Sequence, residues 1–252
     1  MDEIVLYDAP NSPCGRRVRM CLLEKELPFE IRWLNLGLMD QKQPWYLKLN
    51  PNGLVPTLLH GERVIHESNV INEYLDALKP KPRLVPEGAF LQAQMRMWIA
   101  FELDWAKPFR DAVYETMGKA RLQDSGLNEE KLREEISGRT ANPFYLKFAL
   151  KVLKEPKNEE LIADRHAVLL EKMALMEERL ADGRTWLLGE DFSLADIALG
   201  PRTEMFPVIE LFDLYERFPR IGAFMDRLRG RPSWQGSAIL PEGGEKSTKV
   251  AA

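Results

Sequence analysis

Residues 50–75 read NPNGLVPTLLHGERVIHESNVINEYL, and this stretch decides the fold of the first part of the chain. It holds two apolar runs, residues 55–60 and 63–66, which are separated only by Gly61-Glu62. Two short apolar runs joined by so tight a turn predict a β-hairpin. The residues that follow the hairpin place their apolar side chains at helical spacing, so the hairpin is expected to lead directly into a helix.

The sequence before this stretch predicts a strand, a helix and a second strand. The strands are expected at residues 4–7 and 29–34. Between them Ser12-Pro13 marks a helix start, because serine is a favoured N-cap and proline at the first helical position loses no hydrogen bond. The element order β-α-β-(α)-β-β-α indicates a small α/β domain over residues 1–80.

Beyond Pro86 the composition becomes helical and predicts an all-α domain over residues 87–238. Helices are expected near residues 88–118, 128–155 and 159–181, and again after Ser193 and Pro219. Ser193 is followed three residues later by Asp196, a capping-box pattern. The tail, residues 239–252, is polar and contains glycine, so it is expected to be disordered.

Composition and charge exclude several classes of protein. The 252 residues are 45% hydrophobic and carry a net charge of −4, so no surplus of positive charge exists to neutralise nucleic acid. No basic leader and no apolar run of about 18 residues is present, which favours a cytoplasmic protein with no membrane partner. Two cysteines, Cys14 and Cys21, are too few for a disulfide framework, and the three histidines lack metal-ligand spacing, so no metal is expected.

Four motifs taken in order resemble the glutathione transferase superfamily. They are Ser-Pro at the start of the first helix, NPNGLVPTL before the hairpin, HESNVINEYL after it and FSLADI in the helical part. Each motif alone is common, and the weight comes from their order and separation, which span most of the chain. The resemblance implies a thioredoxin-like N-terminal domain that binds glutathione as co-substrate. It also implies an all-helical bundle domain with a pocket for a hydrophobic electrophile, and a homodimer.

The resemblance puts Ser12 at the position of the catalytic serine in serine-type branches of the superfamily, such as the zeta and theta classes. A free thiol with a pKa near 8.5 is only a few per cent thiolate at neutral pH. Lowering that pKa by about two units takes roughly 2.7 kcal/mol, which one hydroxyl donor and a helix N-terminus can supply. The alternative for Ser12 is an ordinary helix cap, and the two roles are compatible. Asn11 is either a second donor or the cap itself.

Cys14 is a competing reactive group, because superfamily branches with an active cysteine carry out glutathione-dependent thiol reduction. It lies two residues beyond Ser12. Its helical spacing to Val18 and Cys21 predicts instead that the thiol faces the core and is inert.

Two further pairs are implied to bind glutathione. Val55-Pro56 resembles the pair whose cis peptide leaves backbone groups free to bond the cysteinyl part of glutathione; the alternative is a trans proline that starts a strand. Glu67-Ser68 resembles the acid-serine pair at the head of the third helix. A helix N-terminus with a hydroxyl suits the γ-glutamyl carboxylate and the acid suits the ammonium, whereas the alternative is that Ser68 only caps the helix.

The remaining candidates lie in less distinctive sequence. Gln41 and Lys42 fall where the superfamily binds the glycine carboxylate, with a solvated loop as the alternative. Tyr114 and Met117 are expected to line the second-substrate pocket. The segment of residues 119–158 is longer than in many superfamily members, a loose likeness to bacterial β-etherases and to reductive dehalogenases.

The sequence is therefore interpreted as a serine-type glutathione transferase that adds the glutathione thiolate to a hydrophobic electrophile. Within catalysis, the alternative is a specialised glutathione-dependent lyase or β-etherase, dehalogenase or isomerase. Outside catalysis, it is a binding or scaffolding protein that keeps the fold without turnover.

Overall fold

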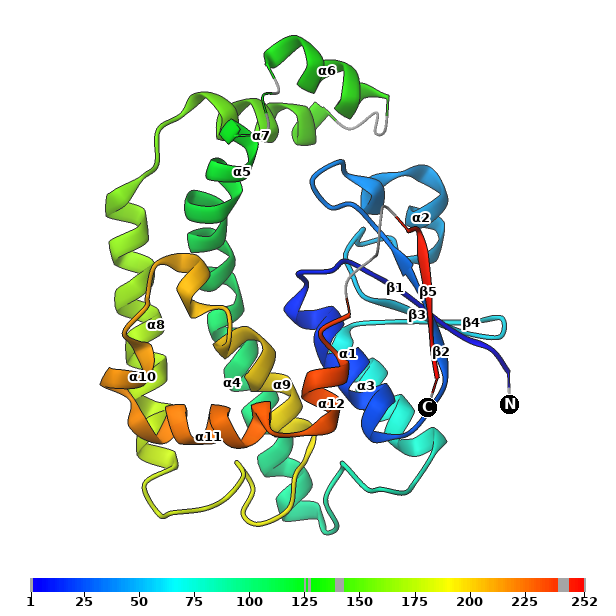
Figure 1. Ribbon diagram of the computed structural model, residues 1–252, viewed down its shortest axis with the longest axis vertical. Coiled ribbons are helices and arrows are strands. Elements are labelled where there is room, and N and C mark those ends of the chain that lie inside the picture. The colour runs from blue at the N-terminus through cyan, green and yellow to red at the C-terminus, as the bar shows by residue number, and fades with distance from the viewer. Residues whose placement is uncertain (1, 125, 127, 139–142, 240–244, 252) are drawn as a thin grey trace.

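The computed structural model describes residues 2–124, 126, 128–138, 143–239 and 245–251. It consists of a sheet-containing domain and a helical domain packed side by side, as Figure 1 shows. This arrangement confirms the predicted fold class. No helix in the described ranges is both long enough and apolar enough to cross a bilayer.

The first domain has the predicted order of strands and helices. Its elements are β1 (Ile4–Asp8), α1 (Pro13–Glu24), β2 (Phe29–Trp33), η1 (Asp40–Lys42), α2 (Pro44–Leu49), β3 (Thr57–His60), β4 (Arg63–His66) and α3 (Ser68–Leu78). The sheet order is β4-β3-β1-β2-β5. Strand β1 is parallel to β2 and antiparallel to β3, and β3 and β4 form the predicted hairpin.

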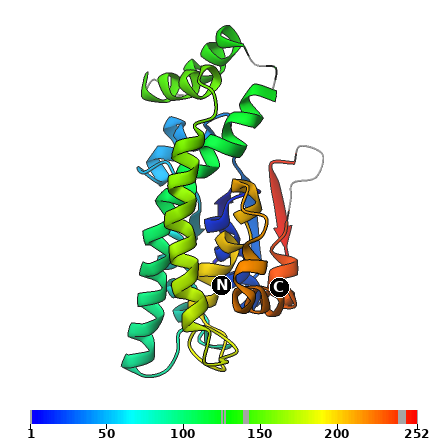
Figure 2. The ribbon, with the colours of Figure 1, turned by 90° about the vertical axis from the view of Figure 1, so that its left-hand side faces the viewer.

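The edge strand β5 (Ser247–Val250) comes from the C-terminal tail and pairs antiparallel with β2. The expectation of disorder is therefore wrong for these four residues, while residues 240–244 and 252 lie outside the described part of the chain. Pairing with residues 247–250 satisfies backbone groups that β2 would otherwise leave unpaired at the edge of the sheet. The Trp33 indole also donates to Thr248 Oγ1 at 2.9 Å. Figures 1 and 2 show β5, in red, lying along the first domain.

The second domain is all-helical, as predicted. Its elements are α4 (Ala89–Val113), η2 (Tyr114–Gly118), α5 (Lys119–Asp124), α6 (Glu129–Ser137), α7 (Pro143–Lys154), α8 (Glu159–Arg179), α9 (Leu194–Thr203), η3 (Phe206–Ile209), α10 (Leu214–Arg217), α11 (Pro219–Arg229) and α12 (Pro232–Gly236). The long helices α4 and α8 run alongside each other (Figure 2). The predicted capping box is present at α9, where Ser193 and Asp196 bond each other's backbone groups.

Two predicted helices differ from those observed. The helix expected over residues 88–118 gives way at Tyr114 to one π-helical turn, η2. The helix expected over residues 128–155 is two helices, α6 and α7, and Pro143 stands at the first position of α7. Proline favours that position, because it has no N–H to donate and its ring fixes a helical φ. Pro108, in contrast, lies inside α4 without ending it.

One apolar core runs through both domains. It joins buried residues of the sheet, such as Leu6 and Leu58, to buried residues of the helical domain, such as Trp105 and Leu199. Helix α1 packs against α3 in its own domain and against α9 and α12 in the other. The start of α1 is therefore held at the boundary between the domains.

Candidate active site

Strand register brings three of the predicted motifs to the same end of strands β1, β3 and β4. Strand β1 ends at Asp8, and Tyr7 pairs with Thr57, the first residue of β3. Thr57 also pairs with His66, the last residue of β4. Ser12 follows β1, Val55-Pro56 precedes β3 and Glu67-Ser68 follows β4. The three motifs therefore meet at this end of the strands.

Ser12 is the N-cap of α1. Its hydroxyl oxygen accepts a hydrogen bond from the Gly15 amide at 3.0 Å, and the residue is only 8% exposed. Among the described residues, no acceptor is recorded for the Ser12 hydroxyl proton. The oxygen can therefore cap the helix while its proton points to another group. Asn11 is exposed and does not cap the helix, so the alternative in which Asn11 is the cap is wrong.

A buried carboxylate that sequence reasoning missed lies beneath the first turn of α1. Asp8 accepts from the Ala9 amide at 2.7 Å and pairs with Arg19 at 3.0 Å. A Cβ built on Gly15 would lie 1.7 Å from Asp8 Oδ1, so only glycine fits there. Burial raises the pKa of Asp8 to about 6 against the opposing attraction of Arg19. The sequence does contain a signal for Asp8, because it is an acidic residue at the end of an apolar strand, shortly before the N-cap Ser12.

Cys14 lies at the domain boundary, and the prediction that it faces the core is wrong. Its side chain is half-buried, with Sγ 3.6 Å from Arg202 Nη2 and 3.9 Å from Arg17 Nη1. Helix α1 packs against α9 of the second domain, and Cys14 meets that domain through Arg202. Cys21 does lie in the core, and burial raises the pKa of its thiol.

A buried ionic cluster ties α1 to the helical domain. The Glu102 carboxylate on α4 accepts from Arg17 on α1 and from Arg202 on α9. Burial alone would raise the pKa of Glu102, but the two guanidinium groups hold it below its usual value. The cluster fixes the position of α1, and with it Ser12, relative to the second domain. These charges are far apart in the sequence, and no local pattern marks them.

The peptide bond between Val55 and Pro56 is cis, as the resemblance implies. Buried polar groups hold the loop before it. The Tyr46 hydroxyl donates to the Leu54 carbonyl at 2.6 Å, and Asn50 Nδ2 donates to the same oxygen at 3.0 Å. Burial raises the pKa of Tyr46 to about 12, so its hydroxyl keeps the proton that it donates. Asn50 is the first residue of the NPNGLVPTL motif and Tyr46 lies in the polar stretch before it, but no local sequence signal predicts that either side chain bonds this carbonyl.

The start of α3 has no side-chain cap. Glu67 occupies the N-cap position, Ser68 is the first helical residue, and no cap hydrogen bond from a side chain is recorded at this helix start. The alternative in which Ser68 merely caps α3 is therefore wrong. Glu67 has a left-handed φ of 71°, a conformation that costs a non-glycine residue about 1–3 kcal/mol and that is often found at functional sites. Its carboxylate is exposed and is 3.4 Å from Asn52 Nδ2.

Lys42 is buried beside this loop, so the alternative of a solvated side chain is wrong for it. Its ammonium donates to the Asn52 carbonyl at 3.0 Å and lies 5.0 Å from the centre of the Tyr145 ring on α7. The absence of a side chain at Gly53 makes space for the Lys42 side chain, because a Cβ at position 53 would lie 2.7 Å from Lys42 Nζ. Gln41 is half-buried, and its Oε1 has no hydrogen-bond partner among the described residues.

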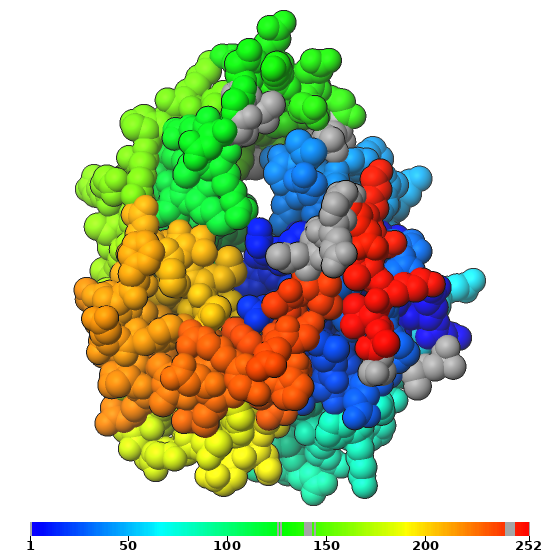
Figure 3. All heavy atoms as spheres, viewed as in Figure 1, coloured from blue at the N-terminus to red at the C-terminus, as the bar shows by residue number. Residues whose placement is uncertain are grey.

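The two predicted second-substrate residues lie in the π-helical turn η2. Tyr114 is partly exposed, and its ring centre is 5.3 Å from that of Phe148 on α7. Met117 is half-buried. In the space-filling view of Figure 3 an opening separates the helical domain, in green, from the first domain, in blue. Across the described ranges, no grouping of three or more histidine, cysteine or acidic side chains has the arrangement of a metal site.

Comparison with known proteins identifies the family. The model for the N-terminal domain of glutathione S-transferase matches residues 11–78, and the model for the C-terminal domain matches residues 141–232. The chain belongs to the glutathione transferase superfamily. Proteins of this superfamily bind glutathione. The match to the N-terminal domain includes Ser12, Val55-Pro56 and Glu67-Ser68.

Relatives of this glutathione transferase superfamily member differ in their named activities. A protein of Vibrio cholerae serotype O1 described as "Probable maleylacetoacetate isomerase" is 28% identical over 94% of this chain and 96% of its own length. Protein LigF of Sphingobium sp. strain SYK-6 is 27% identical over 84% of each chain. The general family is therefore established, whereas the reaction is not.

Solved structures agree with the fold. The crystal structure of the β-etherase LigF covers 93% of this chain and 98% of its own, at 26% identity and a TM-score of 0.78. The glutathione transferase URE2P6 of Phanerochaete chrysosporium, solved in complex with oxidised glutathione, covers 94% of both chains at 21% identity and a TM-score of 0.73.

Proposed function

We propose that this protein is a serine-type glutathione transferase that adds the glutathione thiolate to a hydrophobic electrophile. The observation that carries the proposal is the strand register. It gathers Ser12, the cis Val55-Pro56 loop and the uncapped start of α3 at the same end of strands β1, β3 and β4. A hydroxyl donor, free backbone groups and a helix N-terminus together match the thiol, the peptide and the carboxylate of glutathione.

Each part of glutathione has a partner of suitable chemistry. The γ-glutamyl carboxylate would accept from Ser68 and the first amides of α3, and Glu67 would face the ammonium group. The cysteinyl backbone would pair with Val55, whose position is fixed by the bonds from Tyr46 and Asn50 to the preceding carbonyl. The glycine carboxylate would meet Lys42 and Gln41.

The reaction requires the thiolate form of glutathione. The Ser12 proton would bond to the sulfur, and the nearby helix N-terminus would favour its negative charge. The thiolate then forms a sulfur–carbon bond to the electrophile while the bond from that carbon to the leaving group breaks. The leaving group departs with the electron pair, and the thiol proton is released to solvent.

Glutathione binding is tested by titration calorimetry of the parent protein and of the double variant Glu67→Ala/Ser68→Ala. We expect the parent to bind and the double variant to bind at least about tenfold more weakly, a loss of about 1.4 kcal/mol. Glu62→Ala, in the exposed hairpin turn, is the matched control and should bind like the parent. Absence of binding to the parent would refute the proposal and favour a scaffolding protein that keeps the fold alone.

The role of Ser12 is tested by the pKa of bound glutathione, followed through the ultraviolet absorbance of its thiolate. Ser12→Ala should raise this pKa and lower turnover, whereas Cys14→Ser should leave both unchanged. If Ser12→Ala changed neither, the serine mechanism would be wrong.

A second candidate is glutathione-dependent cleavage of an aryl ether. It is favoured by the similarity to LigF, a β-etherase, along 93% of this chain. The same thiolate would attack the carbon that bears the ether oxygen, and a phenolate would leave. Product analysis with aryl-ether, haloaromatic and cis-enone substrates separates etherase, dehalogenase and isomerase activities from simple conjugation.

We also propose that the protein forms a homodimer through the outer face of α3 and the start of α4. Val70, Phe90 and Met97 expose large apolar side chains there, and Arg96 and Glu73 join the two helices at 2.9 Å. Sedimentation should give twice the chain mass of 29.1 kDa. Phe90→Asp should give monomers, whereas Phe212→Asp, at an equally exposed phenylalanine elsewhere, should not.

A further inference from the structure

The Lys42 ammonium is a buried positive charge whose recorded partners carry no negative charge. Lys42 is only 9% exposed, and its Nζ donates to the Asn52 carbonyl at 3.0 Å. Its other recorded contact is the Tyr145 ring, whose centre lies 5.0 Å from Nζ. Among the described residues, no carboxylate is recorded as a partner of this ammonium. Buried charges in proteins are normally paired, so this position is suited to an anion that the described chain does not supply.

The ring that meets Lys42 comes from the other domain. Tyr145 lies in the first turn of α7, whereas Lys42 is the last residue of η1 in the first domain. An aromatic ring within about 6 Å of an ammonium attracts it through the ring face, and the attraction is stronger where water is excluded. Tyr145 therefore helps to decide where the Lys42 ammonium lies.

Helices α6 and α7 form an arm that stands apart from the rest of the helical domain (Figures 1 and 2). The arm has its own small core, made of Leu132, Ile136 and Ala149, which is separate from the main core. Tyr145 packs against this small core. The position of its ring is therefore set by the fold of the arm.

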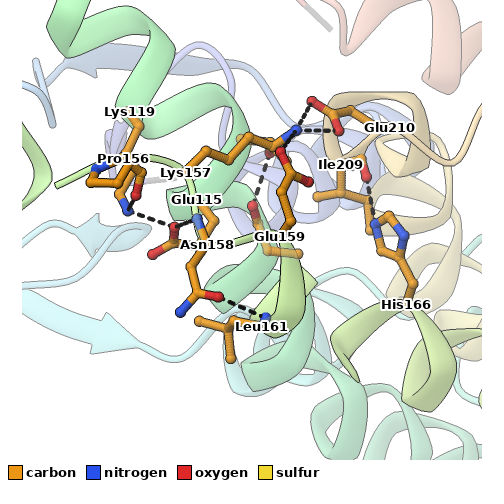
Figure 4. A network of polar contacts seen from close by, with 12 residues as sticks. Glu115, Lys119, Pro156, Lys157, Asn158, Glu159, Leu161, His166, Ile209 and Glu210 are labelled. Atoms are coloured by element: carbon orange, nitrogen blue, oxygen red, sulfur yellow. Dashed lines mark hydrogen bonds and ion pairs between the residues drawn. The ribbon is translucent and has the colours of Figure 1, made fainter. Parts of the chain in front are cut away.

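The base of the arm is held where the chain enters and leaves it. Lys119 is buried and donates to Glu115 Oε2 at 2.6 Å and to the Pro156 carbonyl at 2.8 Å (Figure 4). The Asn158 amide donates to the same Glu115 oxygen at 2.9 Å. Hydrogen bonds to charged groups are stronger than neutral ones, so this cluster holds the two ends of the arm together.

A second set of contacts joins the base of the arm to the rest of the domain. Lys157 bonds both carboxylate oxygens of Glu210, at 2.6 and 2.8 Å, and Asn158 caps α8 by accepting from the Leu161 amide at 3.0 Å (Figure 4). Glu210 follows η3, which packs against both α4 and η2. Because the arm is held in this direction, the Tyr145 ring is in place at Lys42 before a ligand binds, which lowers the cost of ordering the site.

We propose that the arm completes the glutathione site, with Tyr145 as a positioning residue that holds the Lys42 ammonium toward the glycine carboxylate of glutathione. This inference rests on the proposed function. An ammonium has three N–H donors, and the bond to Asn52 uses one of them. A carboxylate can accept from another while the ring attracts the cation and excludes water. An ion pair is stronger where water is excluded.

The test compares two ligands that differ only at the glycine carboxylate. Glutathione ends in that carboxylate, whereas its glycine ethyl ester carries no charge there. The two share the γ-glutamyl and cysteinyl parts, so the ratio of their dissociation constants, measured by calorimetry, reports the glycine end alone. We expect the parent to bind glutathione at least about tenfold more tightly than the ester, because the ester loses a hydrogen bond between charged groups.

The variant Tyr145→Leu removes the ring and keeps an apolar side chain. It should lower the ratio about fivefold and leave the affinity for the ester unchanged. Tyr145→Phe keeps the ring and should retain the ratio, whereas Lys42→Met should abolish the preference. Lys147→Ala, at an exposed position of the same helix, is the matched control. Hydrogen exchange of the α7 amides checks that the arm still folds in each variant.

The outcomes separate this inference from the proposed function. If glutathione binds but the parent does not prefer it to the ester, or if Tyr145→Leu keeps the full ratio, the inference is wrong while glutathione binding stands. If Tyr145→Leu weakens both ligands alike, the ring has only a structural role and the inference is again wrong. If neither ligand binds to the parent, the proposed function fails and the inference fails with it.

Discussion

Glu102 offers a sharp test of how the two domains are held together. Its carboxylate is fully buried between two buried guanidinium groups, Arg17 and Arg202. Glu102→Gln keeps the size of the side chain but removes its charge, and so leaves two positive charges buried without a counterion. Removing one partner of a buried ion pair costs about 3–5 kcal/mol, far more than a surface pair contributes.

We therefore expect Glu102→Gln to lower the free energy of unfolding by about 3–5 kcal/mol. For a chain of this size, that loss corresponds to a fall in melting temperature of about 6–20 °C. The assay is urea unfolding at neutral pH, followed by tryptophan fluorescence. The control is Glu87→Gln, because Glu87 makes an ion pair with Arg83 but is 80% exposed, and the expected loss there is at most about 0.5 kcal/mol.

The pH dependence of the same variant gives an independent check. Because the pKa of Glu102 is lower in the folded protein than its ordinary value of 4.5, its ionised form stabilises the fold above that value. This contribution is lost as the pH falls through the folded-state pKa, so the difference between parent and variant should narrow in acid. A loss below about 1 kcal/mol at neutral pH, or a difference that does not change with pH, would refute the reasoning.

Three further predictions concern local structure. Gly15→Ala should lower the melting temperature by several degrees, because its Cβ would clash with Asp8 at 1.7 Å; Gly230→Ala, with no neighbour closer than 3.4 Å, should not. Asp196→Ala should cost about 2–5 kcal/mol in urea unfolding, because its buried carboxylate accepts three hydrogen bonds. Removing residues 245–252 should cost about 1–3 kcal/mol in urea unfolding and leave glutathione affinity unchanged in calorimetry.

Much of the fold could be predicted because its signals are local. The Gly61-Glu62 turn, the Ser12-Pro13 helix start and the Ser193 capping box each specify an element within a few residues, and all three are present. Strand β5 could not be predicted in this way. Its short run pairs with a strand from the other end of the chain, and a four-residue polar segment has little preference of its own for a strand.

The residues of the candidate site also fall into those with a local sequence signal and those without one. The motifs around Ser12, Val55-Pro56 and Glu67-Ser68 stand out in the sequence, and the register of β1, β3 and β4 then brings them together. The roles of the residues that support them do not stand out. Tyr46 and Asn50 act through one backbone carbonyl, and Glu102 meets its arginines only after the domains pack. Helical spacing wrongly predicted that Cys14 faces the core, because spacing alone does not show where along α1 the second domain makes contact.

The origin of β5 bears on how the protein is made. The other four strands of the sheet leave the ribosome early, but β5 follows the entire helical domain, so the first domain must persist with an open edge along β2 while the helices are synthesised. That exposed edge is a site where two unfinished chains can pair. When β5 pairs with β2, late in synthesis, the exposed edge is removed. A fusion partner attached just after Val250 would therefore lie beside the pair of strands that forms last.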